Sequence, residues 1–417
     1  MDTVELLETL MQADNESVRA TFQDFLRGAM RYAFLEAMEE EVARLCGPKY
    51  ARCAQRQCVR AGSAEGVAYF DTDCESVRRP RVRRRWDDGR SREVGLKTYA
   101  AGKDGESLRQ AVLRSFVAGV SSRQMGRVMA SNRRTSKSEV ARTWQAKAGE
   151  YLDRLRGRDL CADTYVVLML DGVVLSDDLT AVVALGITAQ GVKRMLDFEM
   201  GASENATTCT ALTDRLVQRG LRFATRRPLA VLDGSSALRK AVRKHWCEAH
   251  VQTCLVHVAR NLQGKLSLRR RAELQRLFRA LREASSLEAA REAYGALEGF
   301  VGRHSAEGLK SLHHARDEML TLFRLGVPDT FNKPLLSTNS IENGILNMRR
   351  LLGRVRRWRA ETDMALHWTA CAMLEAERGF RRIQGYGQMQ LLIDALNRDT
   401  PDGEKTEQER FRKEDAA

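Results

Sequence analysis

The sequence predicts an α/β protein in which a segment of buried strands lies between helical regions. Short, β-branched apolar runs closed by Gly or Asp gather between residues 161 and 261, which is the pattern of buried strands. Before and after this segment, apolar residues recur at three- and four-residue spacing, as they do along amphipathic helices. The length of 417 residues exceeds what one hydrophobic core supports, so we expect several structural units.

The first two predicted segments cover residues 1–46 and 47–104. Residues 4–45 have the spacing of two amphipathic helices, and a Gly-Pro pair then breaks the pattern. The second segment is rich in Arg, includes the run RRPRVRRRW at 78–86, and predicts either a basic arm or a small β-unit. The apolar positions that define the helical pattern are Phe22, Phe25, Leu26, Met30, Phe34 and Met38.

Residues 105–155 have the spacing of three short helices, with breaks at 119–121 and 131–132. This pattern is similar to a helix-turn-helix unit, whose last helix enters the major groove of DNA. A three-helix packing unit without any DNA contact fits the same spacing. The residues that would point outward from the last helix are Ser138, Arg142 and Gln145.

The segment from 161 to 261 reads as strand, strand, strand, helix, strand, helix, strand. Its apolar runs include YVVLMLDG, LTAVVALGIT and PLAVLDG, and a Gly-terminated amphipathic stretch precedes the last of these. Four nearby acidic residues of this segment are expected to be surface or loop carboxylates. They are Asp177, Asp178, Asp197 and Glu199.

The C-terminal part is predicted to be helical throughout. Residues 262–330 form an Arg- and Leu-rich helical block that is interrupted near Ser285. Within 331–398, one helix begins near Ser340 and long helices run from 362 to 383. Residues 399–417 are a polar, charged tail.

The charge balance favours a polyanionic partner. Lys and Arg number 69 against 55 for Asp and Glu, which gives a formal net charge of +14, and Arg dominates. Guanidinium groups match phosphate geometry and release counterions on binding, so nucleic acid is the leading partner class. A basic surface that binds nothing is the alternative.

Secretion and membrane insertion are not indicated by the sequence. The N-terminus lacks a basic stretch followed by an apolar one, and the nine Cys do not form the pattern of a small disulfide scaffold. No apolar run approaches the ~20 residues that span a bilayer. We therefore expect a cytoplasmic protein with reduced thiols.

Two Asp-Gly pairs follow apolar runs and are candidates for a catalytic site. Asp171 and Asp233 are each expected to end a buried strand, where a side chain projects into the crevice that binds ligands in α/β sheets. Two such carboxylates suit a hard cation such as Mg²⁺, and two-ion phosphoryl transfer needs a further carboxylate. Glu342, near a predicted helix start, is the candidate. Asp-Gly is also a common turn, and a helix start favours Glu for electrostatic reasons alone.

Four polar residues cluster where a strand leads into a helix, and we expect them beside the active site. They are Cys254, His257, Arg260 and Asn261. A Cys-x-x-His pair could bind zinc, but a structural zinc site needs four ligands, and His245, Cys247 and His250 would have to supply the rest. The other interpretation is that His257 contacts a scissile phosphate or orients a metal-bound water.

In combination, these motifs resemble the Mutator-like transposases of bacterial insertion sequences, and the order and spacing agree over nearly the whole chain. The motifs are LMLDG at 168–172, RGL at 219–221, VLDGSSALRKAV at 231–242, QTCLVHVARN at 252–261 and STNSIENGILNMRR at 337–350.

The resemblance implies an RNase H-like catalytic core with an Asp-Asp-Glu triad at Asp171, Asp233 and Glu342. It implies two Mg²⁺ or Mn²⁺ ions at these carboxylates, and it places Cys254 and His257 beside the site. The interval from Asp233 to Glu342 exceeds a hundred residues. The family fills it with an all-α insertion domain, here residues 262–330, between the two core segments 161–261 and 331–398.

The resemblance also implies the substrates, which are the terminal inverted repeats of the element and target DNA. The helical N-terminal region would bind the repeats. The candidate DNA contacts are Arg81, Arg83, Arg84, Arg85, Arg142, Arg349, Arg350, Arg356 and Arg357, with Arg354 and Arg359 nearby; a solvated basic face is the alternative for those after Glu342.

The expected setting is the bacterial cytoplasm, at the nucleoid, and a homodimer or larger assembly that holds two DNA ends. A DNA-binding regulator without chemistry and a nuclease for RNA or DNA junctions are the rival functions. The chain departs from the family pattern at Asn343, where the family often has Ser. The cysteines at 46, 53, 58 and 74 also depart from it and leave a zinc site in the N-terminal arm open.

Overall fold

The computed structural model describes residues 15–50, 57–129, 136–355, 358 and 362–398. The chain divides into two compact units, Met1–Lys147 and Ala148–Ala417, each of which is described by itself. Both units combine helices with a sheet, so the predicted α/β class is confirmed. No helix among these residues is both long and apolar enough to cross a membrane.

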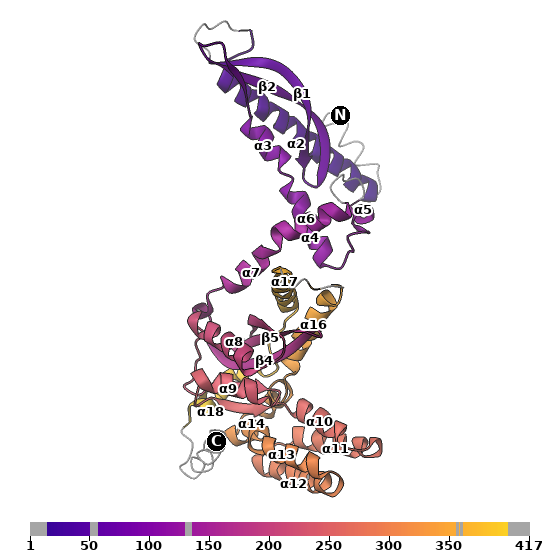
Figure 1. Ribbon diagram of the computed structural model, residues 1–417, viewed down its shortest axis with the longest axis vertical. Helices are drawn as coiled ribbons and strands as arrows, with labels where there is room; N and C mark the ends of the chain where they lie inside the picture. Colours follow the sequence, from indigo (N-terminus) through magenta and orange to yellow (C-terminus); the bar gives the residue numbers. More distant parts are fainter. Residues whose placement is uncertain (1–14, 51–56, 130–135, 356–357, 359–361, 399–417) are drawn as a thin grey trace. The chain divides into compact units, whose positions relative to one another are not determined.

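In the first unit, one long helix packs along a three-stranded antiparallel sheet of order β1-β2-β3 (Figure 1). Phe34 of the helix meets Phe70 of the sheet edge to face, with ring centroids 5.6 Å apart, and Met38 and Val42 are fully buried. The elements are α2 (Asn15–Cys46), β1 (Cys58–Phe70), β2 (Asp73–Arg85), β3 (Ser91–Val94) and α3 (Lys97–Lys103).

The apolar pattern of α2 is buried in its second half only. Phe34 and Met38 lie against the sheet, whereas Phe22, Leu26 and Met30 are more than 40% exposed. Within the described residues the stretch is one continuous helix rather than two, because its spacing continues unbroken from Asn15 to Cys46. The part of the prediction that precedes Asn15 lies outside the described residues.

Three short helices follow in the first unit, as the spacing predicts: α4 (Glu106–Val117), α5 (Met125–Val128) and α6 (Lys137–Lys147). They share a small core of Leu108, Val112, Met125 and Val140. The break predicted at 119–121 falls between α4 and α5, while that at 131–132 lies outside the described residues. The predicted outward residues of α6 are all exposed; they are Ser138, Arg142 and Gln145.

The second unit is built on a five-stranded sheet of order β6-β5-β4-β7-β8. The first three strands pair antiparallel, and β7 and β8 extend the sheet in parallel. The predicted order of strands and helices is confirmed. The elements are β4 (Tyr165–Ser176), β5 (Leu179–Thr188), β6 (Lys193–Gly201), α8 (Ala206–Gln218), β7 (Leu229–Leu232), α9 (Ser236–His245) and β8 (His250–Thr253).

The two faces of β4 pack against different parts of the second unit, and only one of them carries Asp171. Leu168 and Leu170 belong to a buried apolar cluster with α8 and α9, which cover one face of the sheet. Because side chains alternate along a strand, Val167, Met169 and Asp171 belong to the opposite face. α16 (Asn339–Leu352) packs against β4, and α17 (Met364–Arg378) packs against α16, β6 and α7 (Gly149–Arg156).

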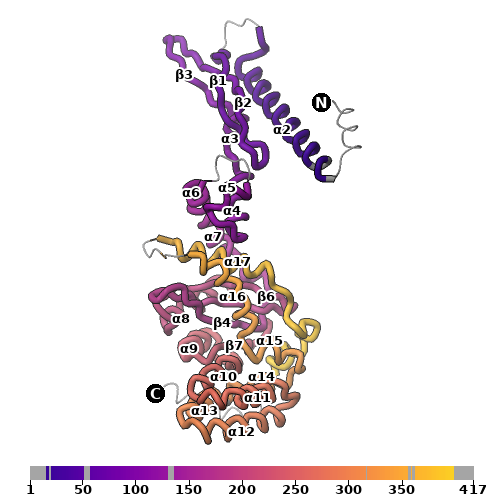
Figure 2. The backbone as a smooth tube through the Cα atoms, turned by 90° about the vertical axis from the view of Figure 1, so that its right-hand side faces the viewer, coloured from indigo at the N-terminus to yellow at the C-terminus, as the bar shows by residue number. Residues whose placement is uncertain are grey.

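Between β8 and α16 the described residues contain helices only, and Figure 2 shows them gathered beside the end of the sheet where β7 lies. α13 contacts β8 and α10. The interruption predicted near Ser285 falls between α11 and α12. The elements are α10 (Leu255–Gly264), α11 (Arg271–Arg282), α12 (Leu287–His304), α13 (Ala306–Met319), α14 (Thr321–Leu325) and α15 (Asn332–Leu335).

Near the C-terminus, the prediction that long helices continue to residue 383 was wrong, because the helix ends earlier. α17 ends at Arg378, and the next residues are not helical until the turn at Tyr386–Gln388, which leads into α18 (Met389–Asn397). Gly379 and the turn at Gly385, with φ of 82°, account for the break.

Candidate active site

Strand register places Asp171 and Asp233 side by side. Met169 of β4 pairs in parallel with Val231 of β7, and each Asp lies two residues further along its strand direction. The two carboxylates therefore stand level on neighbouring segments, on the same side of the backbone. Local sequence patterns predicted Asp171 and Asp233 as candidates, and the parallel pairing of β4 with β7 brings the two residues together.

The prediction that Asp171 ends its strand was wrong. β4 continues to Ser176 because its antiparallel pairing with β5 goes on past Asp171, which pairs with Val183. Only the parallel pairing with β7 stops at Met169. Asp233 does follow the last residue of β7 directly, as predicted.

The glycines after the two Asp residues have different physical roles. Gly234 has a φ of +101°, a conformation that a side chain would strain, and it lets the chain turn from β7 into α9. Gly172 lies against the end of the Glu204 side chain, because a Cβ there would lie 2.6 Å from Oε2 of Glu204 and would displace that carboxyl group. Glu204 is thus a fourth carboxyl at the site. Its pKa is raised by burial and by the charge of Asp233.

Glu342 lies in the first turn of α16, and two contacts hold that helix start against the start of α10. The backbone N–H of Leu255 donates to the carbonyl of Leu336 over 2.9 Å. The backbone N–H of Thr338 donates to Sγ of Cys254 over 3.2 Å. These contacts join segments that are more than 80 residues apart in sequence.

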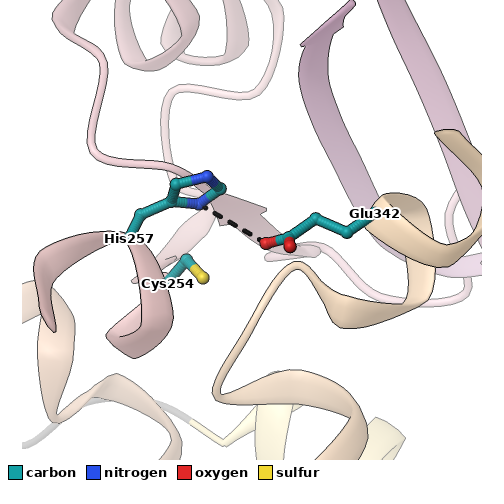
Figure 3. Close-up of side chains that lie close together, drawn as sticks. All are labelled: Cys254, His257 and Glu342. Atoms are coloured by element: carbon teal, nitrogen blue, oxygen red, sulfur yellow. Dashed lines mark ion pairs between the residues drawn. The ribbon is translucent and has the colours of Figure 1, made fainter. Parts of the chain in front are cut away.

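Thr338 is the hub of this junction. Its hydroxyl lies 2.8 Å from Oε1 of Glu342 and 3.2 Å from both Sγ of Cys254 and Nδ1 of His257. It is fully buried. Figure 3 shows the side chains of Cys254, His257 and Glu342 converging, with Nδ1 of His257 3.8 Å from Oε1 of Glu342.

The imidazole of His257 is held in its charged form. Hydrogen bonding to Cys254 raises the pKa of His257 to about 9, and the negative charges of Asp171 and Glu342 act in the same direction against the effect of burial. For Cys254, burial alone would raise the pKa of the thiol, but hydrogen bonds with His257 and Thr338 outweigh burial and lower it. At neutral pH the site therefore contains a cation among carboxylates.

Asp171 is the carboxylate with the least compensation. Burial raises its pKa to about 7, and the charges of Asp233 and Glu342 raise it as well, whereas His257 and the backbone N–H of Gly172 oppose the rise. Its side chain is 8% exposed. A buried carboxyl surrounded by like charges is the arrangement in which a bound cation is favourable.

Two overlapping groups of residues could hold a metal ion. Among the described residues, the ligand atoms of Cys254, His257 and Glu342 are the only set of three that lie within 4.8 Å of one another. However, Cys254 is fully buried and already accepts hydrogen bonds from Thr338. The carboxylates of Asp171 and Asp233, on their level strand segments, are the harder oxygen donors.

The zinc alternative is not supported within the described residues. His245 bonds to Asp214, Cys247 is exposed, and burial lowers the pKa of His250 in β8 to about 4, so none joins Cys254 and His257. Of the N-terminal cysteines, those at 46, 58 and 74 form no such ligand group, and Cys53 lies outside the described residues.

Arg260 and Asn261 both reach the site from α10. Nη2 of Arg260 lies 3.2 Å from Oε2 of Glu342, so Glu342 is bracketed by Thr338 on one oxygen and by Arg260 on the other. Asn261 lines a cleft together with Asp233 and His257. The cluster predicted at the strand-to-helix junction is therefore assembled in the structure.

Sequence comparison identifies the kind of protein that carries this arrangement. Residues 1–364 match the family described as "Transposase, Mutator family", a span that includes Asp171, Asp233 and Glu342. The chain belongs to this family of transposases.

Relatives of the chain include insertion sequence transposases from bacteria. The chain is 26% identical over 355 residues to the transposase for insertion sequence element IS905 of Lactococcus lactis, covering 82% of this chain and 85% of the relative. It is 24% identical over 340 residues to that for IS256 in transposon Tn4001 of Staphylococcus aureus, covering 78% and 84%. It is 25% identical over 282 residues to that for IS1081 of Mycobacterium tuberculosis, covering 63% and 64%.

The predicted DNA-contacting arginines of this Mutator-family chain fall into two groups. In β2, Arg81 pairs with Glu93, Arg84 donates to Gln57, and Arg83 and Arg85 are exposed. In helices, Arg142 of α6 is exposed beside Glu139, and Arg349 and Arg350 are exposed on α16. Arg356, Arg357 and Arg359 lie outside the described residues.

The prediction that Asp197 is a surface or loop carboxylate was wrong. It is fully buried in β6, where Arg215 and Arg219 each donate to Oδ2 over 2.8 Å. Arg215 also pairs with Glu199. Asp197 alternates with apolar residues in the run MLDFEM, and this alternation was the signal for a strand position.

Two further site residues were not found from sequence. Thr338 lies four residues before Glu342 within the quoted motif, and its place at a helix start was the available signal. Glu204 precedes the N-cap residue of α8, and nothing in its local sequence indicates that it approaches Gly172.

Proposed function

We propose that this chain is the DNA transposase of an insertion sequence, which binds the terminal inverted repeats of its element and catalyses metal-dependent strand cleavage and strand transfer. The observation that carries the proposal is the convergence of Asp171 in β4, Asp233 just after β7 and Glu342 in α16 beside His257. This convergence occurs in a chain that belongs to a transposase family.

The catalytic core would be RNase H-like. In support, the sheet has three antiparallel strands followed by two parallel ones, and β4, the first of these five strands along the chain, lies at the centre of the order β6-β5-β4-β7-β8. Residues 262–330 would be the all-α insertion domain, in keeping with the helices between β8 and α16.

Mg²⁺ or Mn²⁺, as two ions, fits the donor chemistry of the site. Asp171, Asp233 and Glu342 offer carboxylate oxygens, and the buried, like-charged surroundings that raise the pKa of Asp171 would be relieved by a cation. When bound, a pair of such ions activates the attacking oxygen and stabilises the leaving oxygen of an in-line displacement.

The protein's own residues supply position and charge. His257, charged at neutral pH, would contact a non-bridging oxygen of the scissile phosphate and balance its negative charge. Thr338 and Arg260 hold the two oxygens of Glu342 and fix the orientation of its carboxylate. Cys254 would orient His257 through their mutual hydrogen bond.

The reaction has two chemical steps. Water attacks the phosphodiester at the element end, the bond to the 3′ oxygen breaks, and that oxygen leaves as a 3′-hydroxyl. The freed hydroxyl then attacks a phosphodiester of target DNA, joining the two strands and releasing a target 3′-hydroxyl. No covalent bond between protein and DNA forms, and both ends would be held in a homodimer or larger assembly in the bacterial cytoplasm.

The test is to incubate the purified chain with Mg²⁺ or Mn²⁺ and a duplex that carries the ends of its own element. We expect nicking at the element end and joining to target DNA. Binding without any cutting would favour a regulator, and cutting that ignores the terminal repeats would favour a nuclease. Either result would overturn the proposal.

A further inference from the structure

A cleft of about 530 Å³ runs from the catalytic residues along the helical block. Asp233 lines it just after β7, His257, Asn261 and Lys265 line it along α10 and its C-terminus, and Lys310 and His314 line it along α13. It is therefore continuous with the site at which the proposed chemistry occurs.

Ion pairs and hydrogen bonds hold both ends of α13, the helix that lines this cleft, to neighbouring elements. At one end, Lys265 of the α10 C-terminus pairs with Glu307 over 3.0 Å and donates to Ser311 over 2.8 Å. At the other end, Glu318 accepts two bonds from the guanidinium of Arg239, at 2.8 and 3.0 Å, and one from Thr253. Since Arg239 is only 6% exposed, this second contact is a buried anchor.

Between the two anchors, Lys310 and His314 are one helical turn apart, so both lie on the cleft side of α13. Both are exposed, and neither has an ion-pair partner among the residues that the structure describes. The neighbouring acids, Glu307 and Glu318, are already neutralised by Lys265 and Arg239. The cleft wall therefore presents the uncompensated positive charge of Lys310, with His314 beside it as a further hydrogen-bonding group, in the same cleft as Asp233.

We propose that this cleft binds the sugar-phosphate backbone of the DNA strand being cut, with Lys310 and His314 contacting the phosphates next to the scissile one. The proposal rests on the proposed strand-cleavage function. A rigid cationic wall beside the carboxylates would orient the scissile bond, because phosphate contacts fix the register of a strand without reading its sequence.

The experiment pairs protein variants with neutralised phosphates. Full-length wild type, Lys310→Ala and the Lys310→Ala/His314→Ala double variant cut element-end duplexes that carry one methylphosphonate at successive positions near the scissile phosphate. Wild type should lose roughly tenfold in single-turnover rate at one or two positions, as expected for a lost charge-assisted bond. Lys310→Ala should lose a similar factor on unmodified DNA and nothing further at its own position.

Two controls keep the result specific. Lys333→Ala removes an exposed lysine of α15 that does not line the cleft, and it should keep the wild-type profile. Lys310→Arg keeps the positive charge, so it should lose single-turnover rate at the same methylphosphonate position as wild type does. If a variant cuts too slowly to measure, the salt dependence of duplex binding replaces the rate, and its log–log slope should fall by about one when Lys310 is removed.

The outcomes separate the cleft from the function on which it rests. If wild type cuts its element ends but Lys310→Ala shows the same methylphosphonate profile and salt slope as wild type, the cleft proposal is overturned and the transposase proposal stands. If wild type neither cuts nor joins its element ends under any divalent cation, both fall together.

Discussion

Asp171 and Asp197 are both buried carboxylates of the same sheet, yet their surroundings act in opposite directions. Asp197 lies among Arg156, Arg215 and Arg219, which outweigh burial and lower its pKa. For Asp171, burial raises the pKa to about 7, and the acidic neighbours Asp233 and Glu342 act in the same direction. Arginines of the fold itself therefore compensate the charge of Asp197, whereas we propose that a bound cation compensates the charge of Asp171.

The largest difference between Asp171 and Asp197 should appear in the activity of DNA cleavage and joining. Asp171→Asn should abolish cleavage and joining, by a factor on the order of 10³ or more, because it removes several kcal/mol of charge stabilisation from the reacting centre. Binding to the element ends should persist, since the DNA-contact candidates lie elsewhere. A single-turnover cleavage assay beside a binding assay checks this, and full activity would remove Asp171 from the site.

Stability should show the reverse order. Asp197→Asn leaves half-buried guanidinium groups partly unpaired around a buried position and should lower the free energy of unfolding by about 3 kcal/mol, as measured by urea denaturation. Asp171→Asn should cost little in the absence of divalent cations, because it removes an uncompensated buried carboxyl. If Asp197→Asn and Asp171→Asn lost equal free energies of unfolding, the two carboxylates would contribute to stability in the same way, and the comparison would fail.

The junction of α10 and α16 offers a sharper test, since Glu342 is placed by side-chain contacts rather than by strand register. Thr338→Val removes the hydroxyl that joins Glu342, His257 and Cys254 while keeping the side-chain shape. Losing a buried hydrogen-bonding group costs about 1–3 kcal/mol, so the cleavage rate should fall about tenfold to a hundredfold. Thr338→Ser should restore most of the rate, and an unaffected Thr338→Val would show that the hub is dispensable.

The smallest expected effect is in the pH dependence of stability. Because the folded state lowers the pKa of Asp197, its contribution is fully present above the unfolded value, near 3.8, and is lost as the pH falls through the folded value. The gap between wild type and Asp197→Asn should be constant near neutrality and shrink below about pH 4. Urea titrations at several pH values measure it, and a gap that widens on acidification would contradict the assignment.

The sequence predicts the strands and the two Asp residues of the site better than the side-chain contacts among its residues. Strand order and the two Asp-Gly pairs were predictable because apolar runs and turn residues are local signals. The role of Thr338, the approach of Glu204 to Gly172 and the pairing of Asp197 with Arg219 were not, because each depends on contacts between residues far apart in the chain. The end of β4 was misjudged since pairing with β5 overrides the turn tendency of Asp-Gly.

The most direct test of the central claim, that Asp171 belongs to a cation-binding carboxylate cluster, is thermal unfolding in increasing Mn²⁺. A ligand that binds only the folded state raises the unfolding midpoint as its concentration exceeds the dissociation constant. Wild type should show this rise, and Asp171→Asn should lose most of it. A rise in Asp171→Asn equal to that of wild type, or no rise in wild type at all, would contradict the claim.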